Sequence, residues 1–504
     1  MEKVKEIYNM KILPCLAAAF AAIPAIAQTP SLPATLWLGI GQDWSLDSNW
    51  SAGLPSASTS AVFNLPVGSS GTIANINGDA YVKDLYFYDG FALGSIGNYD
   101  INIYNSLNVA GNFYYSNLRT ANWGGLRFVA GTGAKFSIAG DASFEATALT
   151  EEQAIVYKNG AVDVQIGRAA STNPMFAEIS IGGDLNISGN SSGSVKVSMA
   201  SDTVNIGGVV NIAASNSTFA VLRATLNNPE YLSNQKWGGL TGSGIVMVEA
   251  ATWTGMAKYD SVFTANITLA NKSDQTFTGQ VKYVNITDGG YSNTSAINLA
   301  MDAENSSATQ TITLGGSAGF TTVSVKNGTL KYSAPAASES LSVSGGKLIL
   351  TNASVTQGDL TMTSGAFGTG NGGAAVKSLA WTGGSLVFVA DGFYGGLPDT
   401  ITVEGVFSKN SLEKIAIDFS GLDAESLIGE SPMTLLSAGS YEGISTSADA
   451  DDYFTATNLY NALANFGWDG NSLTVSFSQI PEPASAAALL GALALLAAVR
   501  RARR

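Results

Sequence analysis

The side chains that this chain of 504 residues lacks already limit the chemistry it can perform. It contains no histidine, and its only cysteine, Cys15, lies near the start of the sequence. These absences exclude imidazole-assisted nucleophiles and zinc sites that need imidazole. Because Cys15 is the only cysteine, the rest of the chain can form no disulfide and no thiolate metal site. Chemistry carried by carboxylates remains, such as the paired carboxylates of glycosidases or the arginine and lysine bases of polysaccharide lyases.

Carboxylates and arginines do not form a recognisable catalytic motif in this sequence. The acidic residues are scattered, and the arginines before residue 500 are Arg119, Arg127, Arg168 and Arg223. We therefore assign no catalytic residue and no cofactor, and we expect no enzymatic activity. A polysaccharide lyase or glycosidase, with carboxylates that meet across neighbouring strands, is kept as an alternative.

One acidic cluster could hold a metal ion, namely Asp449, Asp451 and Asp452. Calcium takes several oxygen ligands, but this cluster lacks the spaced glycines and the glutamate of a calcium-binding loop. We expect a solvated acidic turn here and assign no metal site.

The C-terminal 25 residues, 480–504, combine three distinct features. A triplet, Pro481, Glu482 and Pro483, stands before an uncharged run, 484–499. The basic residues that close the chain are Arg500, Arg501, Arg503 and Arg504. As a helix, the run would span roughly 24 Å, slightly less than the roughly 30 Å hydrocarbon layer, so its flanks would have to help. We expect a transmembrane helix. Its C-terminus should lie in the cytoplasm, because basic residues that flank such a helix favour the cytoplasmic side and the four arginines follow the run. The alternative is a buried helix of the body, although soluble helices rarely lack a polar face.

These three features in this order resemble the PEP-CTERM sorting tail of Gram-negative envelope proteins. The resemblance implies that an exosortase, a membrane protease-transpeptidase, recognises the Pro481–Pro483 triplet. It further implies that the tail is removed while the body passes to the outer surface or to an exopolysaccharide matrix. The inner membrane would then hold the chain only until cleavage.

The N-terminal residues have the pattern of a secretory signal peptide, residues 1–27. Basic residues precede an apolar run, 12–26, which ends in Ala25, Ile26 and Ala27 before Gln28. A basic region, a short apolar core and a small-x-small end are typical of signal-peptidase substrates. We expect the Sec translocon and signal peptidase as partners, with cleavage before Gln28. Met1 and Met10 are both candidate start residues.

The body between residues 28 and 480 is acidic and rich in turn residues. It contains 18 Lys and Arg against 36 Asp and Glu, a balance that disfavours nucleic acid and anionic membranes as partners. The whole chain has 56 glycines and only 13% charged residues. This composition favours many short strands separated by turns.

Two repeated motifs indicate how these strands are arranged. A motif of apolar-x-apolar-small-Gly recurs at irregular intervals, at 107–111, 136–140, 179–183 and 204–208. A second motif, apolar-x-x-Gly-x-apolar, places glycines at 328, 346, 365 and 384, a period of 18 or 19 residues. A short period with alternating apolar residues predicts stacked β-coils in which the glycines allow bends. We therefore predict an all-β fold, a right-handed parallel β-solenoid of roughly 20 to 25 residues a rung.

The amino-acid sequence of the repeats resembles that of the autotransporter-associated β-strand repeats. Examples are Leu240–Gly244, Phe277–Val281 and Val343–Leu348, and the resemblance covers about 230–390. Autotransporters end in a membrane barrel of some 250 or more residues. Here about 90 residues and one apolar run follow the repeats, so we do not expect the chain to export itself.

We predict a cap at each end of the solenoid, which we place at 71–390. The first cap, 28–70, contains Trp37, Trp44 and Trp50, and its sequence resembles the entry segment of secreted bacterial β-helix proteins. A carbohydrate-stacking platform is the alternative for these rings. The second cap is a β-rich module at 391–479, which would keep the last strand from pairing with another chain.

The function predicted from these features is that of an exported structural or adhesin-like protein of the cell surface or an exopolysaccharide matrix. A carbohydrate-binding protein is the first alternative. Its aromatic candidates are Tyr86, Phe87, Tyr88, Tyr114 and Tyr115. Strand alternation should turn about half of these rings inward.

Overall fold

A computed structural model describes residues 30–65, 71–89, 98–117, 125–146, 160–167, 175–190, 193–251, 257–370, 372–388, 399–420, 422–480 and 501. Its elements are β-strands and three short 3-10 turns, so an all-β fold of long parallel sheets, consistent with a β-helix, is confirmed. The chain divides into two compact units, 1–330 with 334–338, and 331–333 with 339–504. Strand β29 (Thr329–Ser333) spans the boundary between them.

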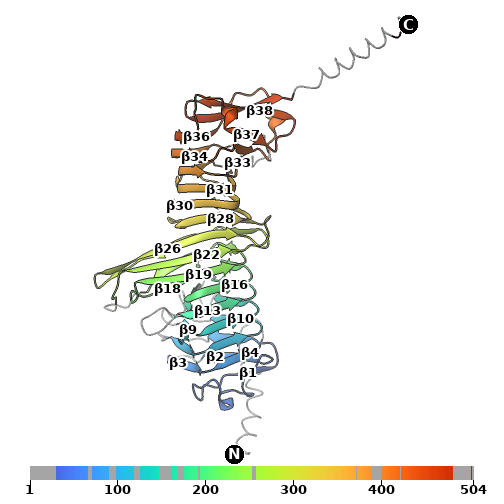
Figure 1. Cartoon of the computed structure of the whole chain (residues 1–504). Coiled ribbons are helices and arrows are strands. Elements are labelled where there is room, and N and C mark those ends of the chain that lie inside the picture. Colours follow the sequence, from blue (N-terminus) through green and yellow to red (C-terminus); the bar gives the residue numbers. More distant parts are fainter. Residues whose placement is uncertain are drawn as a thin grey trace, which may run out of the picture. The chain divides into compact units, whose positions relative to one another are not determined.

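In the first unit, strands from successive passes of the chain stack in three parallel columns (Figure 1). Column A consists of β3 (Gly71–Ile76), β6 (Tyr99–Ile103), β9 (Gly125–Ala130), β12 (Gly160–Ile166), β15 (Gly193–Met199), β18 (Ser217–Ala224), β21 (Ile245–Ala250) and β24 (Gln280–Val284). Column B consists of β4 (Asp79–Val82), β7 (Ser106–Val109), β10 (Lys135–Ile138), β13 (Phe176–Ile181), β16 (Ser201–Ile206), β19 (Glu230–Trp237), β22 (Ser261–Leu269), β26 (Tyr291–Asp302) and β28 (Thr322–Asn327). Column C consists of β1 (Ala34–Leu36), β2 (Ser60–Leu65), β5 (Leu85–Asp89), β8 (Phe113–Asn117), β11 (Ala142–Ala146), β14 (Leu185–Ser188), β17 (Val210–Ile212), β20 (Leu240–Gly242), β23 (Gln275–Phe277) and β27 (Thr309–Thr313).

One strand from each column, taken in the order A, B, C, forms a rung. Successive column A strands begin at residues 71, 99, 125, 160, 193, 217, 245 and 280, so a rung takes 24 to 35 residues. This is longer than the 20 to 25 residues expected from the sequence, because each rung holds three strands and the turns between them vary in length. A two-residue strand, β25 (Thr287–Asp288), pairs antiparallel with the start of β26.

The first repeated motif has the role in column B that the sequence predicts. Leu107, Phe136, Ile179 and Val204 open its four copies, and they are direct register partners on β7, β10, β13 and β16. All four side chains are buried, as are the residues two positions on. Each apolar residue thus packs on its counterpart in the next rung, at a strand spacing of about 4.8 Å.

The glycine that ends each motif makes room for a ladder of Asp and Asn side chains between columns B and C. The ladder residues are Asp84, Asn112, Asp141 and Asp184. Each uses its Oδ1 to accept a backbone N–H from the next rung, at 2.7–2.8 Å. A Cβ on Gly111, Gly140, Gly183 or Gly208 would collide with that oxygen. The full motif is therefore apolar-x-apolar-small-Gly, followed in three of its four copies by Asp or Asn.

At the start of the first unit, three tryptophans pack around Phe63. Trp37, Trp44, Trp50 and Phe63 have ring centroids 4.8–6.4 Å apart, and the indole of Trp50 donates to the Trp44 carbonyl at 2.9 Å. The turn η1 (Asp47–Asn49) lies between Trp44 and Trp50. Only 4% of Trp44 and 3% of Trp50 is exposed, so these two rings cover the apolar interior and have no free face for a sugar, whereas Trp37 is partly exposed.

The second unit is also built from parallel strands. They are β30 (Ser340–Leu350), β31 (Gln357–Thr369), β32 (Ala374–Trp381), β33 (Ser385–Phe388), β34 (Ile401–Lys409), β35 (Ile415–Asp418), β36 (Met433–Glu442) and β37 (Phe454–Thr457). Val343, Met362 and Trp381 are register partners, which confirms the 19-residue period in this unit. The period's glycines in this unit, Gly346 and Gly365 among them, have positive φ (+58° to +95°), so they form the predicted bends.

An antiparallel hairpin closes the second unit. Strands β38 (Ala462–Asp469) and β39 (Ser472–Gln479) pair with each other, and β39 also pairs antiparallel with β36. The turns η2 (Ala424–Leu427) and η3 (Ala450–Asp452) complete this part. Phe466 of β38 lies 6.4 Å from Phe419 and 6.1 Å from Phe454, ring centre to ring centre. The parallel pairing thus ends on an antiparallel strand, which limits addition of another chain at β36.

Candidate functional site

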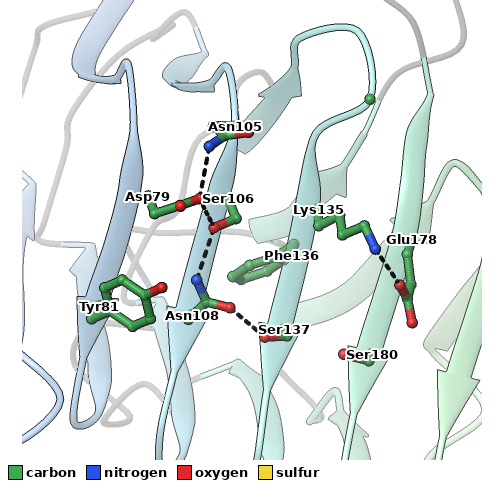
Figure 2. A pocket seen from close by; sticks show the side chains of 11 residues that line it. Asp79, Tyr81, Asn105, Ser106, Asn108, Lys135, Phe136, Ser137, Glu178 and Ser180 are labelled. Carbon is green, nitrogen blue, oxygen red and sulfur yellow. Dashed lines mark hydrogen bonds and ion pairs between the residues drawn. The ribbon is translucent and has the colours of Figure 1, made fainter.

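A hollow of about 450 Å³ lies on the outer face of column B in the first unit (Figure 2). Strands β4, β7, β10 and β13 form its wall. Because neighbouring side chains on a strand point to opposite faces, each strand contributes alternate residues. The outward pairs, strand by strand, are Asp79 and Tyr81, Ser106 and Asn108, Lys135 and Ser137, and Glu178 and Ser180. The residues between them, such as Ala80 and Leu107, are buried in the core.

A chain of hydrogen bonds crosses the hollow from strand to strand. The Asp79 carboxylate accepts from the amide of Asn105 at 2.8 Å and from the hydroxyl of Ser106. Asn108 donates to the Ser106 Oγ at 2.8 Å, and its own oxygen accepts from Ser137 at 3.0 Å. Asn108 also donates to the Ala80 carbonyl at 3.4 Å, so these bonds fix the orientation of its amide. The oxygens of Ser106, Asn108 and Ser137 can each accept a further hydrogen bond.

The two ends of the hollow differ in chemistry. At one end Lys135 and Glu178 form an ion pair of 3.1 Å, with 60% and 38% of their side chains exposed. At the other end the ring of Tyr81 is 52% exposed. Apart from that ion pair and the Asp79 carboxylate beside Tyr81, the side chains on the outer wall of the hollow are uncharged and hydrogen-bonding, with one accessible aromatic ring.

The spacing of its carboxylates makes the hollow unsuitable for glycoside hydrolysis. Asp79, Ser106, Lys135 and Glu178 are successive register partners. Three strand spacings place Asp79 about 14 Å from Glu178. Glycosidases need their two carboxyl groups roughly 5 to 9.5 Å apart, so this pair cannot act together on one bond.

The aromatic candidates on β5 and β8 divide between the two faces as strand alternation predicts. Phe87 and Tyr115 point inward and are buried, whereas Tyr86, Tyr88 and Tyr114 point outward. Tyr86 stacks on Tyr114 at 5.3 Å and on Tyr88 at 6.2 Å, with rings within 12° of parallel. Only 3% of Tyr86 is exposed, and the Ser31 N–H donates to its hydroxyl at 3.3 Å. The stack therefore offers little free ring surface.

Burial keeps these stacked phenols protonated. Burial first, and then the charges of its neighbours beginning with Tyr86, together raise the pKa of Tyr114 to about 12. Burial also raises the pKa of Tyr86 and Tyr88. The stack is thus uncharged at neutral pH.

Both arginines in the described part of the body are held by carboxylates. Arg127 forms an ion pair with Asp100 at 2.6 Å. Arg223 contacts Asp163 at 2.7 Å and Glu249 at 3.5 Å, and Lys196 completes that network at 3.0 Å from Glu249. A base in a lyase has to be free to take a proton, and neither arginine is free in this arrangement. Arg119 and Arg168 lie outside the described residues.

The acidic cluster of the second unit forms an exposed turn. Asp449 caps the turn η3 by accepting the N–H of Asp451 at 3.1 Å, and Asp452 is exposed beside it. In the part of the chain that the structure describes, no group of three or more acidic residues is arranged to hold a metal ion.

The residues assigned to sorting and processing lie almost entirely outside the described residues. They are Pro481, Glu482, Pro483, Arg500, Arg503 and Arg504 in the tail, and Ala25, Ala27 and Gln28 near the start. Arg501 is described and exposed. Over the described ranges, the structure contains no helix with the length and apolar character needed to cross a bilayer.

Comparison of the chain with protein-family models, curated proteins and solved structures finds no match.

The hollow was not predicted from the sequence, although the first repeated motif contains the signal for it. Asn108, Ser137 and Ser180 are the second residues of three successive copies of that motif. Asn108 is the register partner of Tyr81, and Ser137 and Ser180 follow it strand by strand. Once the copies are aligned on their glycines, these polar residues fall into one outward row. The row becomes a site only because β4 adds Asp79 and Tyr81 beside it.

Proposed function

We propose that the chain is an exported structural or adhesin-like protein of a Gram-negative cell surface or exopolysaccharide matrix, with a right-handed β-solenoid as its body. The signal peptide 1–27 directs export. The tail 480–504 holds the chain in the inner membrane until an exosortase cuts at Pro481–Pro483.

The observation that carries this proposal is the largely polar outer face of column B, which exposed Leu232 and Val262 interrupt. On its later strands Asn298 donates to Asn266 at 2.9 Å, and Asn266 donates to Asn234 at 3.0 Å. Thr322 continues the row by donating to Asn298 at 3.0 Å. A long face on which polar side chains predominate, with Lys236 and the Lys135–Glu178 pair as charged members, suits display and contact with a hydrated matrix, and its mixed charges do not favour nucleic acid.

An alanine replacement of the sorting triplet tests the proposal. The variant carries Pro481→Ala, Glu482→Ala and Pro483→Ala, and the matched control is Glu430→Ala, an exposed glutamate of the second unit. In the native bacterium the control should reach the surface or matrix fraction, whereas the triple variant should stay in the inner-membrane fraction. Equal surface amounts of the two would contradict sorting at the triplet.

A second candidate function is saccharide binding, which the hollow on column B favours. Its polar wall, with Asn108, Ser137 and Ser180 in one row, and exposed Tyr81 are the kinds of groups that hold sugar hydroxyls and sugar faces. A glycosidase gains no support from this hollow, because its carboxylates are too far apart. A polysaccharide lyase gains none either, because the one lysine that lines the hollow, Lys135, is paired with Glu178 at 3.1 Å.

A further inference from the structure

We propose that the hollow on β4, β7, β10 and β13 binds a neutral oligosaccharide or polysaccharide that runs along column B, across the strands. The inference rests on the saccharide-binding candidate, and it is independent of sorting at the tail. A sugar ring would stack on Tyr81, and its neighbours along the chain would exchange hydrogen bonds with Asn108, Ser137 and Ser180.

The size and rigidity of the hollow suit such a ligand. Its volume of about 450 Å³ falls in the roughly 300–1,000 Å³ range of small-molecule sites. Its wall is a four-stranded stretch of parallel sheet in continuous register, and the Asp79, Ser106 and Asn108 side chains are held by one another. These side chains are already ordered before a ligand arrives, so binding loses little free energy to ordering them.

The charges of the hollow select a neutral ligand. Lys135 and Glu178 neutralise each other, which leaves Asp79 as the one unpaired charge among the lining residues. A polymer of uronate, sulfate or phosphate groups would meet that carboxylate without a free cation to bind it. Apolar ligands are disfavoured as well, because Tyr81 is the only exposed apolar ring in the lining.

The chemistry of the row matches hydroxyl groups better than a peptide. Asn108 donates to the Ser106 hydroxyl and the Ala80 carbonyl, and Ser137 donates to Asn108, so the oxygens of Asn108 and Ser137 remain to accept from sugar hydroxyls. The Ser180 hydroxyl can donate and accept, as sugar hydroxyls do. A peptide that adds a strand needs a free sheet edge, but β7 and β10 are already paired on both sides. The row repeats about every 4.8 Å, so successive rungs can offer similar contacts to successive units of a polymer.

Two exposed tyrosines provide a matched pair for the test. Tyr81 lines the hollow, whereas Tyr104 does not, and both are 52% exposed. The full-length chain, purified in detergent, would be titrated by calorimetry with cellohexaose, xylohexaose, mannohexaose, laminarihexaose and hexagalacturonate. We expect at least one neutral hexasaccharide to bind, with an affinity lowered about tenfold by Tyr81→Ala and several-fold by Asn108→Ala. Tyr104→Ala should leave the affinity within twofold of the wild type, and hexagalacturonate should bind more weakly than the neutral ligand. Circular dichroism and urea midpoints would confirm that all three variants are folded.

Each contrary result overturns a different statement. If none of the five probes binds at millimolar concentration, the saccharide-binding candidate and this inference both fail. If a neutral probe binds equally to wild type, Tyr81→Ala and Asn108→Ala, saccharide binding stands and the hollow is the wrong site. If hexagalacturonate binds tightest, the assignment of a neutral ligand is wrong.

Discussion

The glycine of the first repeated motif gives the sharpest test of how the rungs stack. In the substitution Gly140→Ala, the new methyl group would collide with Asn112 Oδ1 and with the Gly111 carbonyl. It would also disturb the bond of 2.8 Å in which Asn112 Oδ1 accepts the Asp141 N–H. Overpacking costs about 1–3 kcal/mol and a lost hydrogen bond about 1 kcal/mol, so we expect the free energy of unfolding to fall by about 2–4 kcal/mol.

The assay is urea denaturation followed by tryptophan fluorescence, with Gly78→Ala as the control. A Cβ at Gly78 meets no atom within 4 Å, and its backbone needs no positive φ. That substitution should change the free energy of unfolding by less than about 0.5 kcal/mol or raise it by up to about 1 kcal/mol. Adding Asn112→Ala to Gly140→Ala removes the first of the clashing atoms, so the two effects should fall short of additivity by about 1 kcal/mol. Equal effects of Gly140→Ala and Gly78→Ala would refute the ladder as the reason for the glycine.

Three further predictions concern the cap, the charge network and the tyrosine stack. Trp50→Ala should lower the free energy of unfolding by about 3–5 kcal/mol in the same urea assay, since it empties the centre of the aromatic cap; a change below about 1 kcal/mol would contradict that role. Arg223→Met leaves Asp163 and Glu249 with a single cation, so it should cost about 1–3 kcal/mol in low salt and clearly less in 1 M NaCl; a cost independent of salt would argue against an electrostatic origin. The folded pKa of Tyr114 is about 12, whereas an unfolded phenol titrates near 10, so the stability that this phenol contributes is complete below pH 10 and is lost as the pH rises towards 12. Tyr114→Phe should therefore weaken the decline of the urea midpoint between pH 10 and 12. An unchanged decline would exclude this phenol as its cause.

The sequence predicts the stacking of strands well where a short motif repeats without insertions. In β30 to β33, the 19-residue period predicts which apolar residues pair, as Val343, Met362 and Trp381 show, although the register shifts locally next to Val343. The rung length of the first unit was underestimated, because its motif marks only column B, while columns A and C have variable strands and turns. Neither repeated motif contains a feature that predicts long strands such as β26, which has twelve residues.

The hollow could not be predicted from composition or spacing alone. Its residues come from four rungs, and their positions relative to one another depend on the register, which single motifs do not fix. Tyr81 lies on β4, in the rung before the first copy of the motif, so alignment of the copies would not include it. Its place beside Asn108 follows only from the pairing of β4 with β7.

The most direct test of the proposed role is mass spectrometry of the chain isolated from the cell surface. Sorting predicts a mature protein that begins at Gln28 and ends before the uncharged run 484–499. A surface-located chain that still ends in Arg503 and Arg504 would contradict it.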